Sequence, residues 1–154
     1  MDRKIGNVKH FTVDEANRLI PDLEKILRQI QALNQEINEK ALRLKEEKQA
    51  ARRRGETIEP GTFLQPEAEL DFLITVLGMH EERIAELGGQ LKDEVKGLVD
   101  FPCKRAGQEF LLCWQLGEPE VQFFHGLYDG VRGRKPIASL PADEAAPTEP
   151  PANN

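Results

Sequence analysis

The sequence predicts an α+β protein in which a long antiparallel helical hairpin packs on a small antiparallel β-sheet. Two patterns in the chain support this class. From residue 21 to about 53, and again from 66 to 87, apolar residues recur every three or four positions, as in helices that face a core. After residue 90 the apolar residues instead form short aromatic runs separated by Gly and Pro, as in strands joined by tight turns.

A third pattern places the end of the folded region. Residues 138–154, ASLPADEAAPTEPPANN, are rich in Pro, Ala, Glu and Asn and hold almost no large apolar side chains. Such a segment buries too little apolar surface to offset the entropy lost on ordering. We therefore expect a single α+β domain over residues 1–137 and a disordered tail over 138–154.

The first helix is predicted over residues 11–54. Thr12 and Glu15 have the spacing of a capping box, in which each side chain accepts a hydrogen bond from the backbone amide of the other residue. Pro21 follows within a few turns and predicts a kink or a restart, because proline removes a backbone donor from the helix. Gly55 offers a left-handed cap at the far end.

The second helix is predicted over residues 66–89, and the seam spacing of its apolar residues is typical of a coiled coil. Two long helices joined by the short connection 55–65 favour an antiparallel hairpin. From Pro21 to about Arg53 the first helix would be roughly 50 Å long at about 1.5 Å per residue, which is longer than a compact domain of this size needs. We expect a homodimer through the helices, or another protein partner, to cover the distal turns.

The small sheet is predicted over residues 97–127, with two strands joined by a tight turn at 117–120. The expected opposite pairs are Leu116 with Val121, Trp114 with Phe123, Leu112 with His125, and Phe110 with Leu127. Because side chains alternate along a strand, this register places all eight on one face, and seven of them are apolar. His125 is then the one polar residue on the buried face.

His125 has two interpretations. It can be a hydrogen-bonded core residue, which is the commoner role of a lone buried histidine. Alternatively, a carboxylate such as Asp129 or a glutamate of a helix joins it to make a pH-sensitive or metal-binding site.

The Gly/Arg loop over residues 128–137 is the second candidate binding feature. Its glycines allow backbone amides to form an anion-binding nest, and Arg132, Arg134 and Lys135 add positive charge. The alternative is an exit loop that carries basic residues for solubility and in which Asp129 holds a turn. The predicted ligand-binding residues are His125, Asp129, Glu118, Arg132 and Arg134.

Catalytic and metal motifs are absent from the sequence. His80 begins a helical HEERI segment, but the second histidine of a zinc helix is replaced by Ile84. Cys103 and Cys113, the two cysteines, lack CxxC spacing and are expected to be reduced and structural. We predict no metal and no cofactor, and whether the protein is an enzyme stays open because catalytic groups can meet only in the fold.

Charge and hydropathy limit the partners. A net charge of −6 and a pI near 5.2 argue against binding nucleic acid or anionic membrane, which need a basic surface. The apolar run FLITVLGM is far shorter than a membrane-spanning helix. The N-terminus lacks the apolar core of a secretion signal. We therefore expect a cytoplasmic protein with no membrane partner.

Three segments resemble a known prokaryotic family, the domain of unknown function 2203. They are FTVDEANRLIP near the start, GLVDFP in the middle, and LCWQLGEPEVQFFHGLYDGVRGRKPI near the end, so the resemblance runs from about residue 11 to 137. It implies no activity and supplies no catalytic residues. Phe124 stands where the family usually has Trp, and Gly126 stands where an acidic residue is common. The resemblance therefore implies that any site formed by these two positions is altered in this chain.

Two functions from different classes follow. The first is a non-enzymatic, homo-oligomeric interaction or scaffold protein that uses its long helices. The second is a protein, possibly an enzyme, that binds a small ligand, an anion or a metal around His125 and the Gly/Arg loop.

Overall fold

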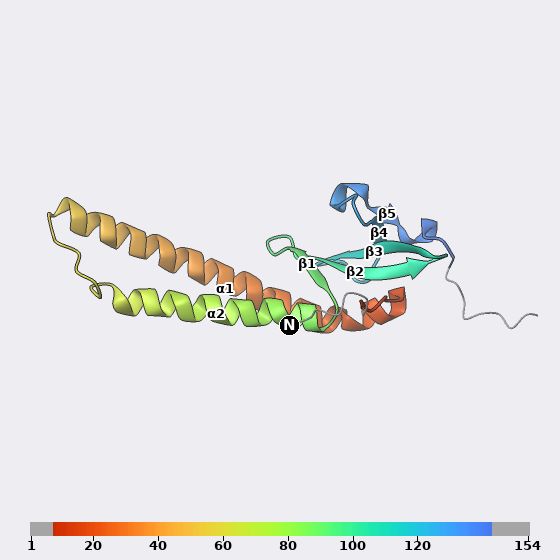
Figure 1. Cartoon of the computed structure of the whole chain (residues 1–154), viewed down its shortest axis with the longest axis horizontal. Helices are drawn as coiled ribbons and strands as arrows, with labels where there is room; N and C mark the ends of the chain where they lie inside the picture. Colours follow the sequence, from red (N-terminus) through yellow and green to blue (C-terminus); the bar gives the residue numbers. More distant parts are fainter. Residues whose placement is uncertain (1–7, 143–154) are drawn as a thin grey trace, which may run out of the picture. The chain divides into compact units, whose positions relative to one another are not determined.

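A computed structural model describes residues 8–142 and shows two long helices followed by a five-stranded antiparallel sheet (Figure 1). The predicted α+β class is confirmed. The chain divides into two compact units. We call residues 25–83 the hairpin unit, and residues 8–24 together with 84–142 the sheet unit. No helix within residues 8–142 is both long and apolar enough to cross a membrane.

Helix α1, Val13–Arg53, begins at the predicted capping box. The Thr12 amide donates to Glu15 Oε1, and the Glu15 amide donates to Thr12 Oγ1, both at 3.1 Å. These two bonds satisfy backbone donors that have no partner within the helix. The helix continues through Pro21 without interruption, so the expected restart is wrong.

The other end of α1 closes on Gly55, as predicted. Gly55 has a φ of 75°, its amide donates to the Arg52 carbonyl, and the next amide, of Glu56, donates to the Ala51 carbonyl. This is the pattern in which a left-handed residue lets the last helical carbonyls find donors. The chain can therefore leave the helix at this point.

In the hairpin unit, α2, Leu64–Glu86, runs antiparallel to α1, and the two helices lie side by side (Figure 1). Ion pairs join them, among them Lys40 with Glu69 at 3.8 Å and Lys48 with Glu67 at 3.0 Å. The buried residues of this unit all lie on α1: Ile26, Leu27, Ile30, Leu44 and Ala51. None of residues 64–83 on α2 is buried.

The sheet contains β1 (Gln90–Asp93), β2 (Leu98–Arg105), β3 (Gln108–Gln115), β4 (Phe123–Gly126) and β5 (Lys135–Pro136). The strands follow one another in sequence order and all neighbours are antiparallel. The two edge strands β1 and β5 lie outside the segment 97–127 where the sequence predicts a sheet. Each of these strands is too short for an alternation of apolar and polar residues to be recognised in the sequence.

The predicted register of β3 and β4 is wrong by one residue. His125 pairs with Leu111 instead of Leu112, and Phe123 pairs with Cys113 instead of Trp114. A one-residue shift moves every side chain of one strand to the other face of the sheet. His125 therefore lies on the face opposite to Trp114.

One face of the sheet, which we call the core face, is apolar. It carries Val99, Phe101, Cys103, Phe110, Leu112, Trp114 and Phe124. The ring of Phe11, just before α1, contacts Phe101 edge to face at 5.0 Å between centroids. The Asn17 side chain on α1 accepts a hydrogen bond from the Val121 amide at 2.7 Å, so the first turns of α1 are tied to the sheet.

The other face, which we call the site face, carries Asp100, Leu111, Cys113, Phe123 and His125. The chain after β4 continues through two short 3-10 helices, Val131–Gly133 and Ile137–Ser139, and then buries Leu140. The tail that the sequence predicts as disordered, 138–154, begins within this described segment, at residues 138–142. Its remaining residues, 143–154, lie outside the described part of the chain.

Candidate functional site

The centre of the candidate site is a buried pair formed by His125 and Asp100. His125 Nε2 lies 2.9 Å from Asp100 Oδ2, and the two side chains are 4% and 3% exposed. His125 Nδ1 lies 2.8 Å from the Gly126 carbonyl oxygen, which can only accept, so Nδ1 carries a hydrogen. One proton must therefore lie between Nε2 and Oδ2, on one atom or the other. The expected carboxylate, Asp129 or a helical glutamate, is wrong: the partner is Asp100.

The strand geometry explains why these two residues meet. Asp100 is the third residue of β2, and its neighbours Val99 and Phe101 point to the core face. The alternation along the strand therefore sends the Asp100 carboxylate to the site face. His125 reaches the same face from β4 because its true register partner is Leu111.

Cys113 on β3 is the third member of this cluster and lies directly opposite Asp100 in the register. Burial raises the pKa of the Cys113 thiol to about 12, and the negative charge of Asp100 adds to the effect. Cys113 is therefore a thiol in the metal-free protein. The ligand atoms of Asp100, Cys113 and His125 lie within 4.8 Å of one another, and among residues 8–142 no other such group of three is found.

A pocket of about 370 Å³ opens beside the cluster. Asp100, Cys113 and His125 contribute to its wall, and Lys92, Lys96 and Tyr128 belong to its lining. The two lysines place positive charge near a site that already holds a carboxylate. The pocket can therefore receive a small anionic or metal-bound group.

Glu118 and Arg134, two of the predicted site residues, form a second polar pair. Glu118 Oε1 lies 2.6 Å from Arg134 Nη2, and the side chains are 17% and 18% exposed. The Arg134 guanidinium lies 4.2 Å from the centroid of the Phe123 ring, and Nη2 also donates to the Cys113 carbonyl at 3.3 Å. Arg134 thus connects this pair to the backbone of the buried cluster.

The same glutamate organises the loop between β3 and β4. Its carboxylate accepts a hydrogen bond from the Gln115 amide at 2.6 Å, and its carbonyl accepts one from Trp114 Nε1 at 2.9 Å. Glu118 is therefore engaged in holding the loop.

Asp129 and Arg132, the other predicted residues, are not part of the cluster. Asp129 Oδ2 accepts from the Gly126 amide at 3.1 Å, which is the turn-holding role of the alternative interpretation. A Cβ at Gly126 would lie 2.5 Å from that oxygen, and one at Gly133 would lie 2.5 Å from Asp129 Cβ, so both glycines allow this close approach. Arg132 is exposed and forms no hydrogen bond or ion pair with the described residues.

Of the five predicted residues, the structure brings only His125 into the buried cluster. Sequence reasoning missed the other two members, Asp100 and Cys113. A signal for Asp100 was present, because a charged residue interrupts the apolar run LVDFP and a buried charge needs a partner. Cys113 carried no comparable signal, since a small buried thiol is an ordinary core residue.

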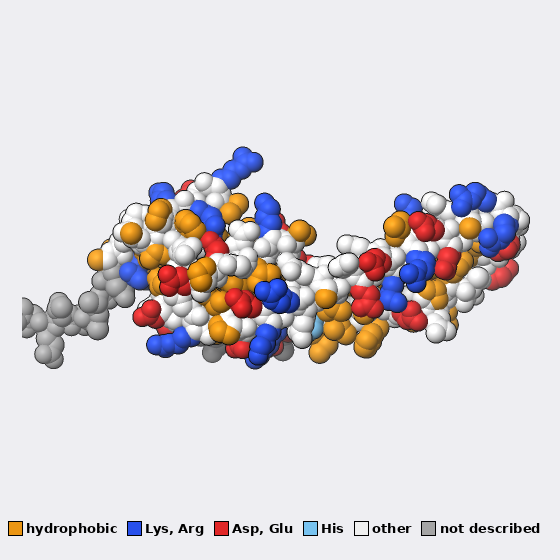
Figure 2. Space-filling model, turned by 180° about the vertical axis from the view of Figure 1, so that it is seen from behind, with side chains coloured by type: hydrophobic (Ala, Val, Ile, Leu, Met, Phe, Trp, Pro, Cys, Tyr) orange, Lys and Arg blue, Asp and Glu red, His pale blue; other side chains and the backbone are white. Residues whose placement is uncertain are grey.

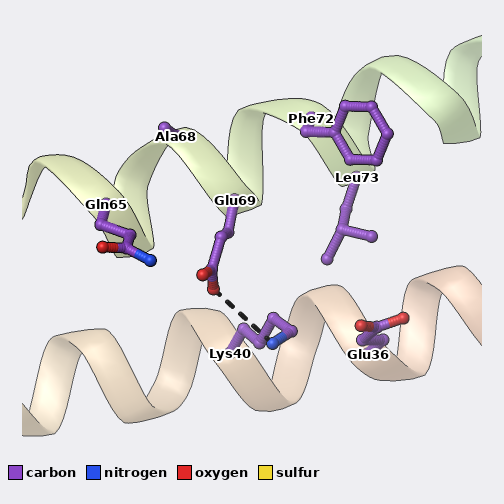
Figure 3. Close-up of a pocket in the computed structure, with 7 residues that line it drawn as sticks. All are labelled: Glu36, Lys40, Gln65, Ala68, Glu69, Phe72 and Leu73. Carbon is purple, nitrogen blue, oxygen red and sulfur yellow. Dashed lines mark ion pairs between the residues drawn. The ribbon is translucent and has the colours of Figure 1, made fainter.

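The hairpin unit offers a second surface. A groove of about 440 Å³ between α1 and α2 is lined by residues that include Glu36, Lys40, Glu69 and Phe72. Figure 3 shows the Lys40–Glu69 ion pair bridging the two helices, with Leu73 pointing from α2 toward α1 while the Phe72 ring does not. Figure 2 shows hydrophobic side chains gathered on the surface of this unit.

Comparison with known proteins gives one match. Residues 9–137 match the family described as Uncharacterized conserved protein (DUF2203). No curated protein and no solved structure matches the chain.

Proposed function

The chain belongs to the DUF2203 family, and we propose that it is a protein-interaction module that self-associates through α2 of the hairpin unit. The observation that supports this most strongly is the exposure of large apolar side chains on that helix. Phe72 is 67% and Met79 is 65% exposed. We further propose that it acts in the cytoplasm, a compartment that suits its two reduced cysteines.

Helix geometry shows that α2 has two apolar faces. Residues three, four and seven apart on a helix share a face, so Phe72, Val76 and Met79 form one row. We call these three residues the outer row. Leu70, Leu73 and Leu77 form a second row about a quarter to a half turn away, and all three are only partly exposed. A helix that needed only α1 as a partner would have one such row.

The occupant that we propose for the outer row is a second copy of the chain. Two α2 helices can pack antiparallel about a two-fold axis near Val76. A residue a given number of positions before 76 on one helix then faces the residue the same number of positions after 76 on the other helix. Glu69 then lies opposite Arg83 of the partner subunit, which places opposite charges at both ends of the apolar contact. A 41-residue α1, about 60 Å long at 1.5 Å per residue, gives a hairpin long enough for such a contact.

Light scattering during size exclusion tests this proposal. The wild-type protein should have twice the 17.4 kDa mass of the chain. Phe72→Asp should give a monomer, because it buries two uncompensated carboxylates in the symmetric contact, and hot-spot losses are about 2 kcal/mol or more. Ile74→Asp is the matched control: Ile74 is 52% exposed on the same helix but points away from the outer row. A monomeric wild type, or equal behaviour of the two variants, would contradict the proposal.

A second candidate function is binding of a small ligand in the pocket of the sheet unit. It is favoured by the buried His125–Asp100 pair in the pocket wall and by Lys92 and Lys96 in the pocket lining. Thermal unfolding in the presence of divalent metals, inorganic phosphate or nucleotides tests it, because a ligand that binds the folded state raises the unfolding midpoint.

The matched variants for this second candidate are Lys96→Glu in the pocket lining and Lys104→Glu, an exposed lysine at the other end of β2. An anionic ligand should protect wild type and Lys104→Glu and should protect Lys96→Glu less. If no compound of any class raises the midpoint, the pocket is not a binding site.

A further inference from the structure

We propose that Asp100, Cys113 and His125 together bind one divalent transition-metal ion on the site face of the sheet, with zinc as the best chemical match. The inference rests on the second candidate function, ligand binding in the sheet unit. It is independent of self-association through α2.

The three donors are a carboxylate, a thiol and an imidazole, which are the ligand types that zinc takes in proteins. Bond lengths of about 2.0–2.3 Å place tetrahedral ligand atoms roughly 3.5 Å apart. The three atoms here already lie within 4.8 Å of one another, and Nε2 and Oδ2 are 2.9 Å apart. Small side-chain rotations therefore suffice to bring all three around one ion.

The imidazole is already oriented as metal-binding histidines are. Its Nδ1–H donates to the Gly126 carbonyl at 2.8 Å, which fixes the ring and directs Nε2 toward Asp100 and Cys113. A second hydrogen bond of this kind is the usual support of a ligating histidine. In addition, Asp100 Oδ1 is buried and has no hydrogen-bond partner among the described residues, so one carboxylate oxygen is available to a further group.

Charge balance selects a divalent ion. A thiolate, a carboxylate and a neutral imidazole together carry two negative charges, so a divalent cation bound to all three gives a site with no net charge. Any protons on these ligands leave to water when the ion binds. A monovalent or trivalent ion would leave a charge in a site that is almost fully buried.

Three protein ligands leave one tetrahedral position for water or another group, as in catalytic zinc sites and unlike structural ones. The pocket of about 370 Å³ adjoins the same three residues and supplies a route for the ion and room for the fourth ligand. Lys92 and Lys96 in its lining would favour an oxyanion there.

Cobalt(II) titration of the chelator-treated full-length protein tests the site, because cobalt replaces zinc and its bond to a thiolate has a distinctive absorption. We expect a sulfur-to-cobalt charge-transfer band together with intense visible bands of a tetrahedral ion, at one ion per chain. Zinc should abolish these bands by competition.

The two cysteines supply a matched pair of variants, since each is 1% exposed and they lie on opposite faces of the sheet. Cys113→Ser should lose the charge-transfer band and bind cobalt at least about 100-fold more weakly, whereas Cys103→Ser should keep both. A band that survives Cys113→Ser, or that Cys103→Ser removes, would overturn the assignment.

The outcome also separates this inference from the candidate function on which it rests. If phosphate or nucleotides protect the protein against unfolding while wild-type protein binds neither cobalt nor zinc, the pocket is a ligand site without a metal. If neither metals nor anions bind, both ideas fail and the His125–Asp100 pair is structural.

Discussion

The two units of the chain use apolar residues in opposite ways. In the sheet unit, Trp114, Phe101 and Leu112 are completely buried. In the hairpin unit, α2 has no buried residue between 64 and 83 and exposes Phe72 and Met79. Polar groups show the reverse: the sheet unit buries His125 and Asp100, while the ion pairs of the hairpin unit are partly exposed.

This difference is the basis of the separate roles that we propose for the two units. A unit that has filled its core and also buries a histidine–aspartate pair beside a pocket has the features of a binding site. A unit that leaves large apolar side chains in water has the features of an interaction surface. Substitutions that are similar in chemistry should therefore have different effects in the two units.

The largest difference is expected between Trp114→Ala and Phe72→Ala. Removing the fully buried indole should lower the free energy of unfolding by about 4 kcal/mol, since it leaves a cavity and breaks the bond to the Glu118 carbonyl. Phe72→Ala, at a side chain that is two-thirds exposed, should change monomer stability by less than about 1 kcal/mol. Urea denaturation at a concentration that favours the monomer measures both; equal losses would remove the contrast between the units.

His125→Ala should be the next most damaging change. It leaves the Asp100 carboxylate buried without its partner, and breaking a buried pair in this way costs about 3 kcal/mol or more. The control is His10→Ala, because His10 pairs with Glu109 at 3.2 Å but both side chains are at least one-third exposed. That variant should lose less than about 1 kcal/mol. Chemical denaturation with chelator present isolates the effect of the pair. Similar losses of unfolding free energy in the two variants would show that burial does not determine how much a histidine–carboxylate pair contributes to stability.

Two glycines with nearly the same positive φ allow the effect of backbone strain to be separated from the effect of packing. Gly88 has φ of 95° and a Cβ there would lie 2.5 Å from the Phe11 ring, whereas Gly61 has φ of 91° and nothing within 4 Å. Alanine at either position should lower the free energy of unfolding by about 1 kcal/mol, because a side chain is strained at a positive φ. Gly88→Ala should cost about 2 kcal/mol more because the ring must move. The difference in thermal midpoint tests this, and no difference would mean that Phe11 shifts freely.

The smallest contrast concerns two ion pairs. Arg134→Ala should cost about 1.5 kcal/mol, because its bond to Glu118 is short and mostly buried. Lys48→Ala, which breaks the exposed pair with Glu67 in the hairpin unit, should cost less than about 0.5 kcal/mol. Double-mutant cycles with Glu118→Ala and Glu67→Ala measure the two coupling energies, and a stronger Lys48–Glu67 coupling would contradict this ranking.

Local signals in the sequence predicted the helices well. The capping box at Thr12 and Glu15 and the cap at Gly55 depend only on neighbouring residues, and both are confirmed in the structure. The restart expected at Pro21 is wrong, since α1 runs through this residue.

The register of the sheet could not be predicted in the same way. In one register of the FFHG strand Phe123 lies on the core face, and in the other register Phe124 does. Because both place an aromatic ring there, the alternation of side chains alone does not distinguish the two registers. The structure selects Phe124, which contacts Phe110 edge to face at 5.4 Å. The loop before it is held by Glu118 through side-chain and backbone bonds that no turn rule contains.

The site depended on that register. With His125 placed on the wrong face, the sequence points to other acidic residues, such as Asp129, as its partner. The actual partner, Asp100, lies 25 positions away and meets His125 only after three strands have paired. Long-range pairs of this kind require the fold.

Native mass spectrometry of the untagged protein, purified from its own host without chelator, tests most directly whether the two units have separate roles. We expect a dimer of the wild-type chain that carries one divalent metal ion per chain. Phe72→Asp should remove the dimer and keep the metal, and Cys113→Ser should remove the metal and keep the dimer. A bare monomer, or variants that lose both properties together, would contradict the account.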